Sequence, residues 1–512
     1  MSRPSYSPCR RAGAAVLAAA AIVASAAASA ADIPGAPPDE TSGLTMPRQF
    51  KSAEAPSPPA AASSGAAASE VPWWTLFHDP ALAQLEAQAL GANPDLHEAM
   101  ERVLEARAQA AAASSDLLPQ VSAPLAASRV HTTNTGPVTT SRLIGAAFFP
   151  TTPGTPETFQ GQALENTYSD YQLPLAVAYE VDVFGRIRNA RDRARAMAEA
   201  SAAERQSLRL SLTSQVATTY FALRAADSAV AVLQNTSRLR GESVQVQENR
   251  VKGGAASDVD LLRARVEASN TEADLVDAGQ ERAELENALA VLCGQPASDF
   301  HVAPQPLDQV PFPAVPMIIP AQLLSQRPDL VEAEHRIAAA AAGEKVARAE
   351  FYPVINVQGA IGFESSQDNL LLEGQSHTWA IGGTINIPIF NGGRNAADLR
   401  AARARKEEAY DAYRQAALVA LREVEDALSS LRSRVAQADA RQRAVADARR
   451  VFSASQHSYG EGGLTYFEVI DSQRVLLAAE LAGVRTQSAR YAAAVDLIRA
   501  MGGTFEPAAA AP

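Results

Sequence analysis

The chain has 512 residues, of which 47% are hydrophobic, 6% aromatic and 20% charged, and its formal net charge is −12. This acidic balance argues against a nucleic-acid partner, because a phosphate backbone requires a basic face. The catalytic patterns HExxH, GxSxG, GxGxxG and CxxC are missing and the seven His are scattered, so the sequence predicts no enzyme, no metal site and no cofactor.

Residues 1–30 have the pattern of a secretory signal. Arg3, Arg10 and Arg11 precede an apolar, alanine-rich run that ends in small residues at 28–30. We expect cleavage after residue 30 and export of the rest of the chain. The following stretch, 31–70, is rich in Pro, Ala and Ser and is predicted to be a disordered linker.

Cleavage would remove Cys9 and leave Cys293 alone, so no intramolecular disulfide could form. We interpret Cys293 as a small apolar residue near a helix end rather than a catalytic thiol. No later stretch supplies about 20 uninterrupted apolar residues, which predicts no transmembrane helix.

One phrase occurs twice in the chain. "NPDLHEAMERV" at 93–103 returns as "RPDLVEAEHRI" at 327–337, so that Pro94 corresponds to Pro328. A second proline follows at the same distance in both cases, at Pro119 and at Pro353. Chance rarely reproduces both a phrase and its distance to the next landmark, so the sequence predicts two internal repeats.

Four segments alternate apolar and polar residues, at 121–129, 171–183, 355–364 and 379–389. Successive strand side chains point to opposite faces, so each segment would have one apolar and one polar face. Each is close to the 9–11 residues that a tilted strand needs to cross a bilayer. A half-buried sheet in a soluble protein is the alternative.

Long helices account for most of the remainder. The stretch 191–249 has no Pro and one Gly, and at 1.5 Å per residue a helix of roughly 60 residues is about 90 Å long. Apolar residues recur there, and again after residue 416, at spacings of four and three, the pattern of a coiled-coil seam. The seam residues are Leu212, Val216, Thr219, Leu223, Ala226, Val230 and Leu233, then Ala417, Leu421, Val424, Leu428, Leu431, Val435 and Ala438.

Both long helices lead into the pattern Gly-x-x-Ser/Thr-x-x-Asp/Glu. Glycine closes one helix, the hydroxyl caps the next, and the acid meets the positive end of that helix. We therefore expect two helical hairpins, with turns at Gly254, Ser257 and Asp260 and at Gly462, Thr465 and Glu468.

The two halves differ in the length of one loop. The repeated phrases are offset by 234, whereas matching Arg188 with Arg394 gives an offset of 206. The drop predicts about 28 extra residues in the first half, between its strands, where an insertion is tolerated best.

Four stretches carry a family resemblance, at 72–96, 327–353, 387–404 and 459–474. In their order and duplication the chain resembles the outer-membrane factor family, the TolC-like exit ducts. It is most similar to the subgroup that serves resistance-nodulation-division efflux pumps.

The resemblance implies an α+β membrane protein. Three subunits would each give four strands to a 12-stranded β-barrel, continued by a long periplasmic α-helical coiled-coil tunnel. The repeats would span 71–295 and 321–503, joined by a Pro-rich linker at 296–320 and followed by a flexible tail at 504–512. The residues point the same way, because four strands cannot close around a lumen and an open edge in lipid leaves backbone groups unpaired.

The implied function is passive conduction of small molecules across the outer membrane of a Gram-negative cell. The implied partners are two further copies of the chain, a periplasmic adaptor, an inner-membrane pump and outer-membrane lipid. Two alternatives stay open: a duct for a type I-like protein secretion system, and a structural periplasmic coiled-coil or adaptor protein. The alternating segments argue against the second.

The family closes its tunnel at the periplasmic tip with acidic rings and side-chain links. The matching positions are Asp260, Tyr459, Glu468 and Asp471. A ring of carboxylates would favour cations. Solvated turn residues are the alternative for the acids, and Leu464 stands where some relatives use an Arg to tie the gate.

The tips are also where the family docks its adaptor, which makes Gly254, Ser257, Gly462 and Thr465 candidate contacts. Many members of the subgroup carry a lipidated Cys directly after the signal. This chain has no Cys there, so we expect no N-terminal acyl anchor.

Overall fold

The computed structural model describes residues 50–51, 72–131, 167–255, 257–313 and 326–503, all within one unit, Pro47–Pro512. The predicted signal at 1–30 and tail at 504–512 lie outside the described residues. The same holds for most of the predicted linker at 31–70, of which Phe50 and Lys51 are described. Phe50 is buried against a cluster that includes Leu330, Val424 and Met501.

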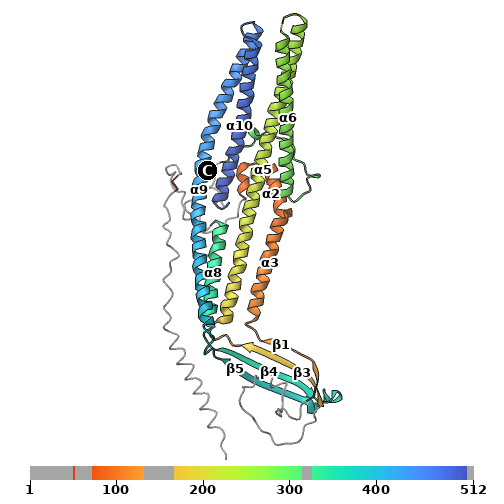
Figure 1. The fold of residues 1–512 in the computed structure, drawn as a ribbon, viewed down its shortest axis with the longest axis vertical. Helices are drawn as coiled ribbons and strands as arrows, with labels where there is room; N and C mark the ends of the chain where they lie inside the picture. Colours follow the sequence, from red (N-terminus) through yellow and green to blue (C-terminus); the bar gives the residue numbers. More distant parts are fainter. Residues whose placement is uncertain (1–49, 52–71, 132–166, 256, 314–325, 504–512) are drawn as a thin grey trace, which may run out of the picture. The chain divides into compact units, whose positions relative to one another are not determined.

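Helices dominate the described part of the chain (Figure 1). They are α2 (Pro80–Ala92), α3 (Pro94–Ser115), α5 (Arg186–Lys252), α6 (Asp258–Leu292), α8 (Pro328–Ala349), α9 (Arg394–Gly460) and α10 (Tyr466–Ala500). The strands are β1 (Gln120–Ser122), β2 (Ala126–His131), β3 (Thr167–Glu180), β4 (Val354–Ser365) and β5 (His377–Asn386).

Helices in the two halves of the chain have equal lengths. α3 and α8 have 22 residues each, α5 and α9 have 67, and α6 and α10 have 35. The starting numbers of α3 and α8, 94 and 328, differ by 234. Those of α5 and α9, 186 and 394, differ by 208, and so do those of α6 and α10, 258 and 466.

The predicted offset of 206 is therefore wrong by two. Arg186 and Arg394 are the first residues of α5 and α9, and each follows a glycine in the left-handed region, Gly185 at φ 79° and Gly393 at φ 86°. Such a glycine ends the loop before the helix, so it fixes the register more firmly than the matched letters at Arg188. The insertion in the first half is then slightly shorter than predicted.

α5 is the central helix and packs against α3, α6, α8 and α10, while α9 packs against α8 and α10. In Figure 1, α6 runs back beside the second half of α5, and α10 beside the second half of α9. All the predicted seam residues are buried or half-buried, with Val216, Leu223 and Val424 at 0% exposure.

The largest core cluster lies where the two hairpins meet the shorter helices. Phe77, Phe221 and Tyr491 contact one another in this cluster with tilted rings; Phe221 lies 4.8 Å from Phe77 and 4.7 Å from Tyr491, centroid to centroid. Residues from 300 to 310, in the stretch predicted to join the repeats, are buried in the same cluster. Asp227 holds this connection, because its carboxylate accepts from Arg282 at 2.7 Å and from the Gln305 amide at 3.0 Å.

The strands form an antiparallel sheet in the order β1–β3–β4–β5, with β2 also paired to β3. β1 and β2 pair with β3 in one continuous register, interrupted at 123–125, where Pro124 cannot donate to the ladder. Gly362 pairs with Pro174, and a Cβ at Gly362 would lie 2.2 Å from the Leu173 carbonyl oxygen, so the close approach of β3 requires glycine.

This register gives the sheet one apolar and one polar face. Leu175, Ile361 and Trp379 are cross-strand neighbours on the apolar face, and Ile361 and Trp379 are 51% and 68% exposed. Gln172 pairs with Glu364 on the polar face, which also carries Glu180, Asn356 and Gln358. The alternation predicted from the sequence therefore extends across β3, β4 and β5, whereas β2 places Arg129 on the apolar face.

Among the described helices, only α5 contains a stretch whose length and composition would permit a membrane span, and half of that stretch is buried inside the fold. The core helix of a globular protein passes the same test. We assign the stretch to the core, because the buried residues of α5 include Val216, Tyr220 and Phe221.

Candidate functional site at the helical tips

Each hairpin turns through a glycine that closes a long helix. Gly254 has φ 69° and Gly462 has φ 80°. The next amide reaches back to the helix in both turns, from Ala255 to the Arg250 carbonyl and from Gly463 to the Ser458 carbonyl, each at 2.8 Å. These are Schellman closures, which satisfy carbonyls that the helix end leaves unpaired.

The hydroxyls cap the returning helices as predicted. Ser257 accepts from the Val259 amide at 3.1 Å. Thr465 and Glu468 form a capping box, in which Glu468 Oε2 accepts from the Thr465 amide at 2.7 Å. Glu468 therefore has a local role at the start of α10, although its exposed carboxylate also keeps a negative charge at the tip.

Tyr459 links the two hairpins. Its hydroxyl oxygen accepts from Gln247 Nε2 at 2.9 Å, and the guanidinium of Arg250 lies 4.7 Å from the ring centroid. Gln247 and Arg250 belong to α5, whereas Tyr459 belongs to α9. The Tyr459 ring also lies 5.6 Å from the ring of Tyr466 at the start of α10.

The other two predicted gate acids lie apart from this contact. Asp260 is half-buried and lies 3.5 Å from Arg263, and Asp471 is exposed. Asp260 does contribute to the electrostatics of the tip. Burial raises the pKa of Tyr466, at the start of α10, to about 12, and the charges of Tyr459 and Asp260 add to this effect. Within the described residues, no hydrogen bond or ion pair joins the four predicted gate residues to one another.

A buried ion cluster, Arg240–Glu267–Arg474, lies farther along the hairpins. Glu267 of α6 is 3.1 Å from Arg240 of α5 and accepts from Nε of Arg474 of α10 at 2.9 Å. The Arg240 and Glu267 side chains are only 5% and 7% exposed, while Arg474 is 54% exposed. Arg240 also donates to Thr271 and, at 2.9 Å, to the Glu267 carbonyl.

Burial lowers the pKa of Arg240, and the charge of Glu267 opposes that effect. A single carboxylate thus holds two guanidinium groups from different hairpins. Removing it would leave a charge in a site that excludes water, which destabilises a protein strongly.

An apolar layer separates this ion cluster from the tips. Ala264, Tyr466, Val469 and Ile470 are buried there, with Val244 and Phe452 packed against them. The layer draws on all four helices of the two hairpins. It packs beside the buried Arg240–Glu267 pair and joins the hairpins close to their turns.

Sequence reasoning missed Arg240, Glu267, Arg474 and Gln247. A signal for two of them was available, because the four-and-three spacing of the α5 seam continues from Leu233 through residue 237 to Arg240, Val244 and Gln247. Arg240 and Gln247 are buried. A polar residue at a seam position marks a specific partner, since its burial is unfavourable without one.

The polar groups at the tips bond to backbone amides and to side chains of the two hairpins. The described residues contain no group of three or more His, Cys, Asp or Glu arranged to hold a metal ion. Cys293 is fully buried, and burial raises the pKa of its thiol to about 11, which fits the predicted structural role.

Comparison with known proteins identifies the family. The family model described as "Outer membrane efflux protein" matches residues 85–295 and 319–503. The chain belongs to the outer membrane efflux protein family. Its predicted family resemblance, outer-membrane location and efflux function are thereby confirmed.

Individual proteins agree with this assignment. The chain is 30% identical to the pyoverdine export outer membrane protein OpmQ of Pseudomonas aeruginosa over 91% of this chain and 92% of that protein. It is 29% identical to the cation efflux system protein CusC of Escherichia coli K12, over 84% and 88%. The solved outer-membrane channel OprN superposes with a TM-score of 0.76 at 27% identity, over 92% of this chain and 99% of that one.

Proposed function

We propose that this outer membrane efflux protein is the exit duct of a tripartite system. An inner-membrane pump of the resistance-nodulation-division type and a periplasmic adaptor would deliver small molecules to it. The observation that carries the proposal is the combination of an amphipathic antiparallel sheet with two long helical hairpins, in a chain of this family.

The duct would be a homotrimer. β5 is paired only with β4, and β1 and β2 only with β3, so each edge of the described sheet has unused backbone donors and acceptors. β1 and β2 share one register on β3 and count as one interrupted strand, so each sheet is four strands wide. Three such sheets joined edge to edge would give a closed 12-stranded barrel and leave no edge in lipid. The apolar face with Ile361, Trp379 and Ile381 would contact lipid, and the polar face would line the lumen.

Two internal repeats would build each subunit. The equal lengths of α5 and α9 and of α6 and α10 support this assignment. In a trimer, the six hairpins would form the wall of a periplasmic tunnel.

The tunnel would close where the hairpins of one subunit are tied together. The Gln247–Tyr459 hydrogen bond, the ion cluster and the apolar layer would hold α9 and α10 against α5 and α6. Asp260, Glu468 and Asp471 would add negative charge around the aperture and favour cations. Opening would separate the hairpins and break these contacts.

The adaptor would dock on the exposed turns. Gly254, Ser257, Gly462 and Thr465 are all exposed, and their polar groups are used within the turns. The adaptor would therefore recognise the shape of the two Schellman turns and the residues around them.

The names of the relatives support small molecules as the transported compounds. OpmQ is named for pyoverdine export and CusC for cation efflux. The alternative of a protein secretion duct is not favoured by these relatives. The sheet with its exposed apolar face also disfavours a soluble adaptor.

A deletion strain and its complemented parent test the function. We expect the deletion to retain a fluorescent amphiphile while its secreted proteins stay unchanged. Normal dye handling with one secreted protein missing would assign the chain to protein export.

A further inference from the structure

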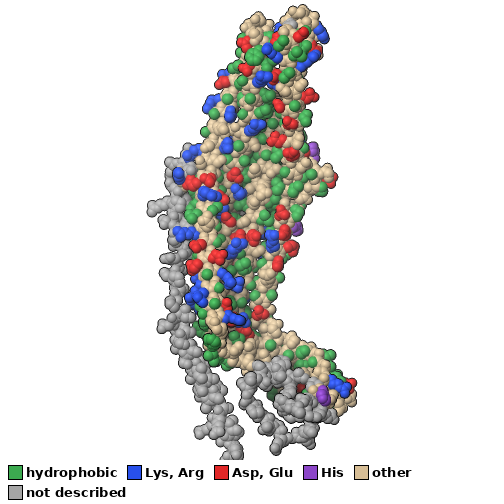
Figure 2. Space-filling view, in the orientation of Figure 1, with side chains coloured by type: hydrophobic (Ala, Val, Ile, Leu, Met, Phe, Trp, Pro, Cys, Tyr) green, Lys and Arg blue, Asp and Glu red, His purple; other side chains and the backbone are tan. Residues whose placement is uncertain are grey.

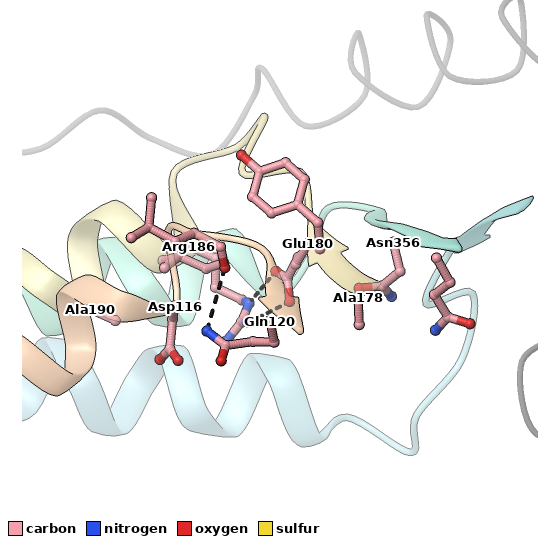
Figure 3. Close-up of a pocket in the computed structure, with 11 residues that line it drawn as sticks. Asp116, Gln120, Ala178, Glu180, Arg186, Ala190 and Asn356 are labelled. Atoms are coloured by element: carbon pink, nitrogen blue, oxygen red, sulfur yellow. Dashed lines mark hydrogen bonds and ion pairs between the residues drawn. The ribbon is translucent and has the colours of Figure 1, made fainter. Parts of the chain in front are cut away.

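A cavity of about 350 Å³ lies where the sheet meets the helices (Figure 3). Its walls come from the connection between α3 and β1, the end of β3, the start of α5, and β4. The strand residues Glu180, Asn356 and Gln358 that line it lie on the polar face of the sheet. In the proposed duct this face lines the lumen, so the inference rests on the proposed function.

The guanidinium of the arginine in the cavity wall is already paired with a carboxylate. Arg186 donates from Nε and Nη2 to the two carboxylate oxygens of Glu180 at 3.0 and 2.7 Å, a bidentate pair that Figure 3 draws as dashed lines. Hydrogen bonding to Glu180 raises the pKa of Arg186, and the charges of Glu350 and Asp182 add to this effect. An anionic ligand would therefore find no free cation among the described residues of the wall.

Hydrogen-bond acceptors remain available. Asp116 ends α3 at the rim of the cavity, and its carboxylate has no hydrogen-bond or ion-pair partner among the described residues. Oε1 of Gln358 is buried and also has no partner within the described part of the chain, but β3 separates it from β1 and from Asp116. With the Arg186–Glu180 pair neutralised, the wall carries the uncompensated charge of Asp116.

An apolar wall lies beside these acceptors. Leu118, Ile187 and Ala190 contribute it, and Ile187 is only 4% exposed. The volume is at the lower end of the range of about 300–1,000 Å³ for small-molecule sites. A ligand that fits would be small, with an apolar body and a cationic head that donates hydrogen bonds.

We propose that this cavity is a transit site for organic ammonium ions that carry a small apolar body. The ammonium group sits beside Asp116, and the apolar body packs on Ile187 and Ala190. Asp116 is solvent-exposed, so the attraction is screened and binding is weak. Weak binding suits a duct, because a conducted species must leave its sites as readily as it enters them.

Binding to the purified, detergent-solubilised protein tests the proposal. The probe is 2-phenylethylammonium, and 2-phenylethanol is its neutral match in size. Equilibrium dialysis should show saturable binding of the ammonium ion and at least several-fold weaker binding of the alcohol. Asp116→Asn should weaken ammonium binding roughly three- to fivefold, the size expected for one exposed charge pair.

Two further variants keep the test decisive. Ala190→Leu fills the cavity and should abolish binding, with an unchanged oligomer on size-exclusion chromatography. Asp439→Asn removes an exposed acid in the middle of α9, away from the cavity, and should leave binding unchanged. Equal binding of amine and alcohol, or full binding by the Ala190→Leu variant, would overturn the proposal.

Binding and efflux together distinguish an error in the proposed transit site from an error in the proposed duct function. If the wild-type protein restores dye efflux to a deletion strain but binds no ammonium probe, only the transit site is wrong. If it binds the probe as expected but restores no efflux, the duct is wrong and the cavity is an ammonium site of another kind.

Discussion

Gln247 of α5 donates a hydrogen bond to the hydroxyl oxygen of Tyr459 of α9 over 2.9 Å, between residues that are 212 positions apart in the chain. The bond crosses from one hairpin to the other. Figure 2 shows acidic and basic side chains together over the ends of both hairpins. Most of these charges face solvent, whereas the Gln247–Tyr459 hydrogen bond joins the two hairpins directly.

Tyr459→Phe removes this tie and keeps the ring beside Arg250. We expect a loss of about 1–3 kcal/mol in the contact, because Gln247 then keeps a buried donor without a partner. Single-channel conductance in planar bilayers should rise. The matched control is Tyr410→Phe on α9, outside the tip, which should leave conductance unchanged.

Glu267→Gln should be the most damaging single change near the tips. It leaves the buried Arg240 without its counter-charge, so we expect the free energy of unfolding to fall by about 3 kcal/mol or more. Denaturant unfolding of the detergent-solubilised protein measures it, with Glu281→Gln on an exposed site of α6 as the control. Equal stability of these two variants would contradict the role of the ion cluster.

The double variant Arg240→Met/Glu267→Leu separates stability from closure. Replacing a buried ion pair by apolar side chains of similar size is often neutral. We therefore expect stability to recover while Arg474 stays released from α6. If conductance in this variant is higher than in the wild type, the ion cluster ties the hairpins together. Wild-type conductance would limit the cluster to a stabilising role.

Glu468 requires a pair of substitutions, because its charge and its capping role coincide. Glu468→Gln keeps the capping box and removes the charge, whereas Glu468→Ala removes both. Together with Asp471→Asn, Glu468→Gln should lower the cation preference of the channel. Unchanged selectivity and conductance in this double variant would assign both acids to solvated turns.

Glu86 predicts a pH dependence of stability in the core. It is fully buried, neither carboxylate oxygen has a partner among the described residues, and burial raises its pKa to about 9. The unfolded chain releases this proton near pH 4.5, while the folded chain keeps it. The free energy of unfolding should therefore fall as pH rises from about 4.5 to about 9, by up to about 1.4 kcal/mol per pH unit.

Glu86→Gln removes this titration. Its stability relative to the wild type should increase with pH across that range and be constant below about pH 4.5. Thermal unfolding at several pH values measures the difference, and only the slope counts, because Gln also buries an amide. If the free energies of unfolding of the variant and the wild type changed in parallel with pH, Glu86 would be charged in the folded protein.

The orientation of the sheet gives a final prediction. Ile381→Arg places a charge on the apolar face and should destabilise the membrane-inserted protein by about 2–4 kcal/mol near the bilayer centre. Thr384→Arg, on the polar face of the same strand, should cost far less. Urea unfolding from lipid vesicles measures both, and the reverse order would invert the assigned faces.

Much of the architecture could be predicted from the chain alone. The helical hairpins followed from the absence of proline and from the seam spacing, and the turns followed from Gly254 and Gly462 with their capping hydroxyls. The strand segments followed from alternation with period two. These are local rules, since backbone sterics and burial of one face act within a few residues.

The site was less predictable. Tyr459, Asp260, Glu468 and Asp471 came from a resemblance, and the structure ties only Tyr459 to the other hairpin, while Glu468 caps its own helix. Gln247 and Glu267 were missed. The seam position of Gln247 could have indicated a buried polar contact, but no local pattern gives the partner of either residue, because the contacts join residues far apart in the chain.

The sequence by itself determined the helices, the turns, the two faces of the strands and the family. Those properties depend on residue type and spacing, and they recur wherever the same spacing recurs. Only the tertiary structure decided that Glu267 holds arginines of both hairpins, that Arg186 is neutralised by Glu180, and that α5 and α9 correspond from their first residues. Such pairings depend on which side chains meet when the helices pack, and that meeting is fixed by the geometry of the whole fold.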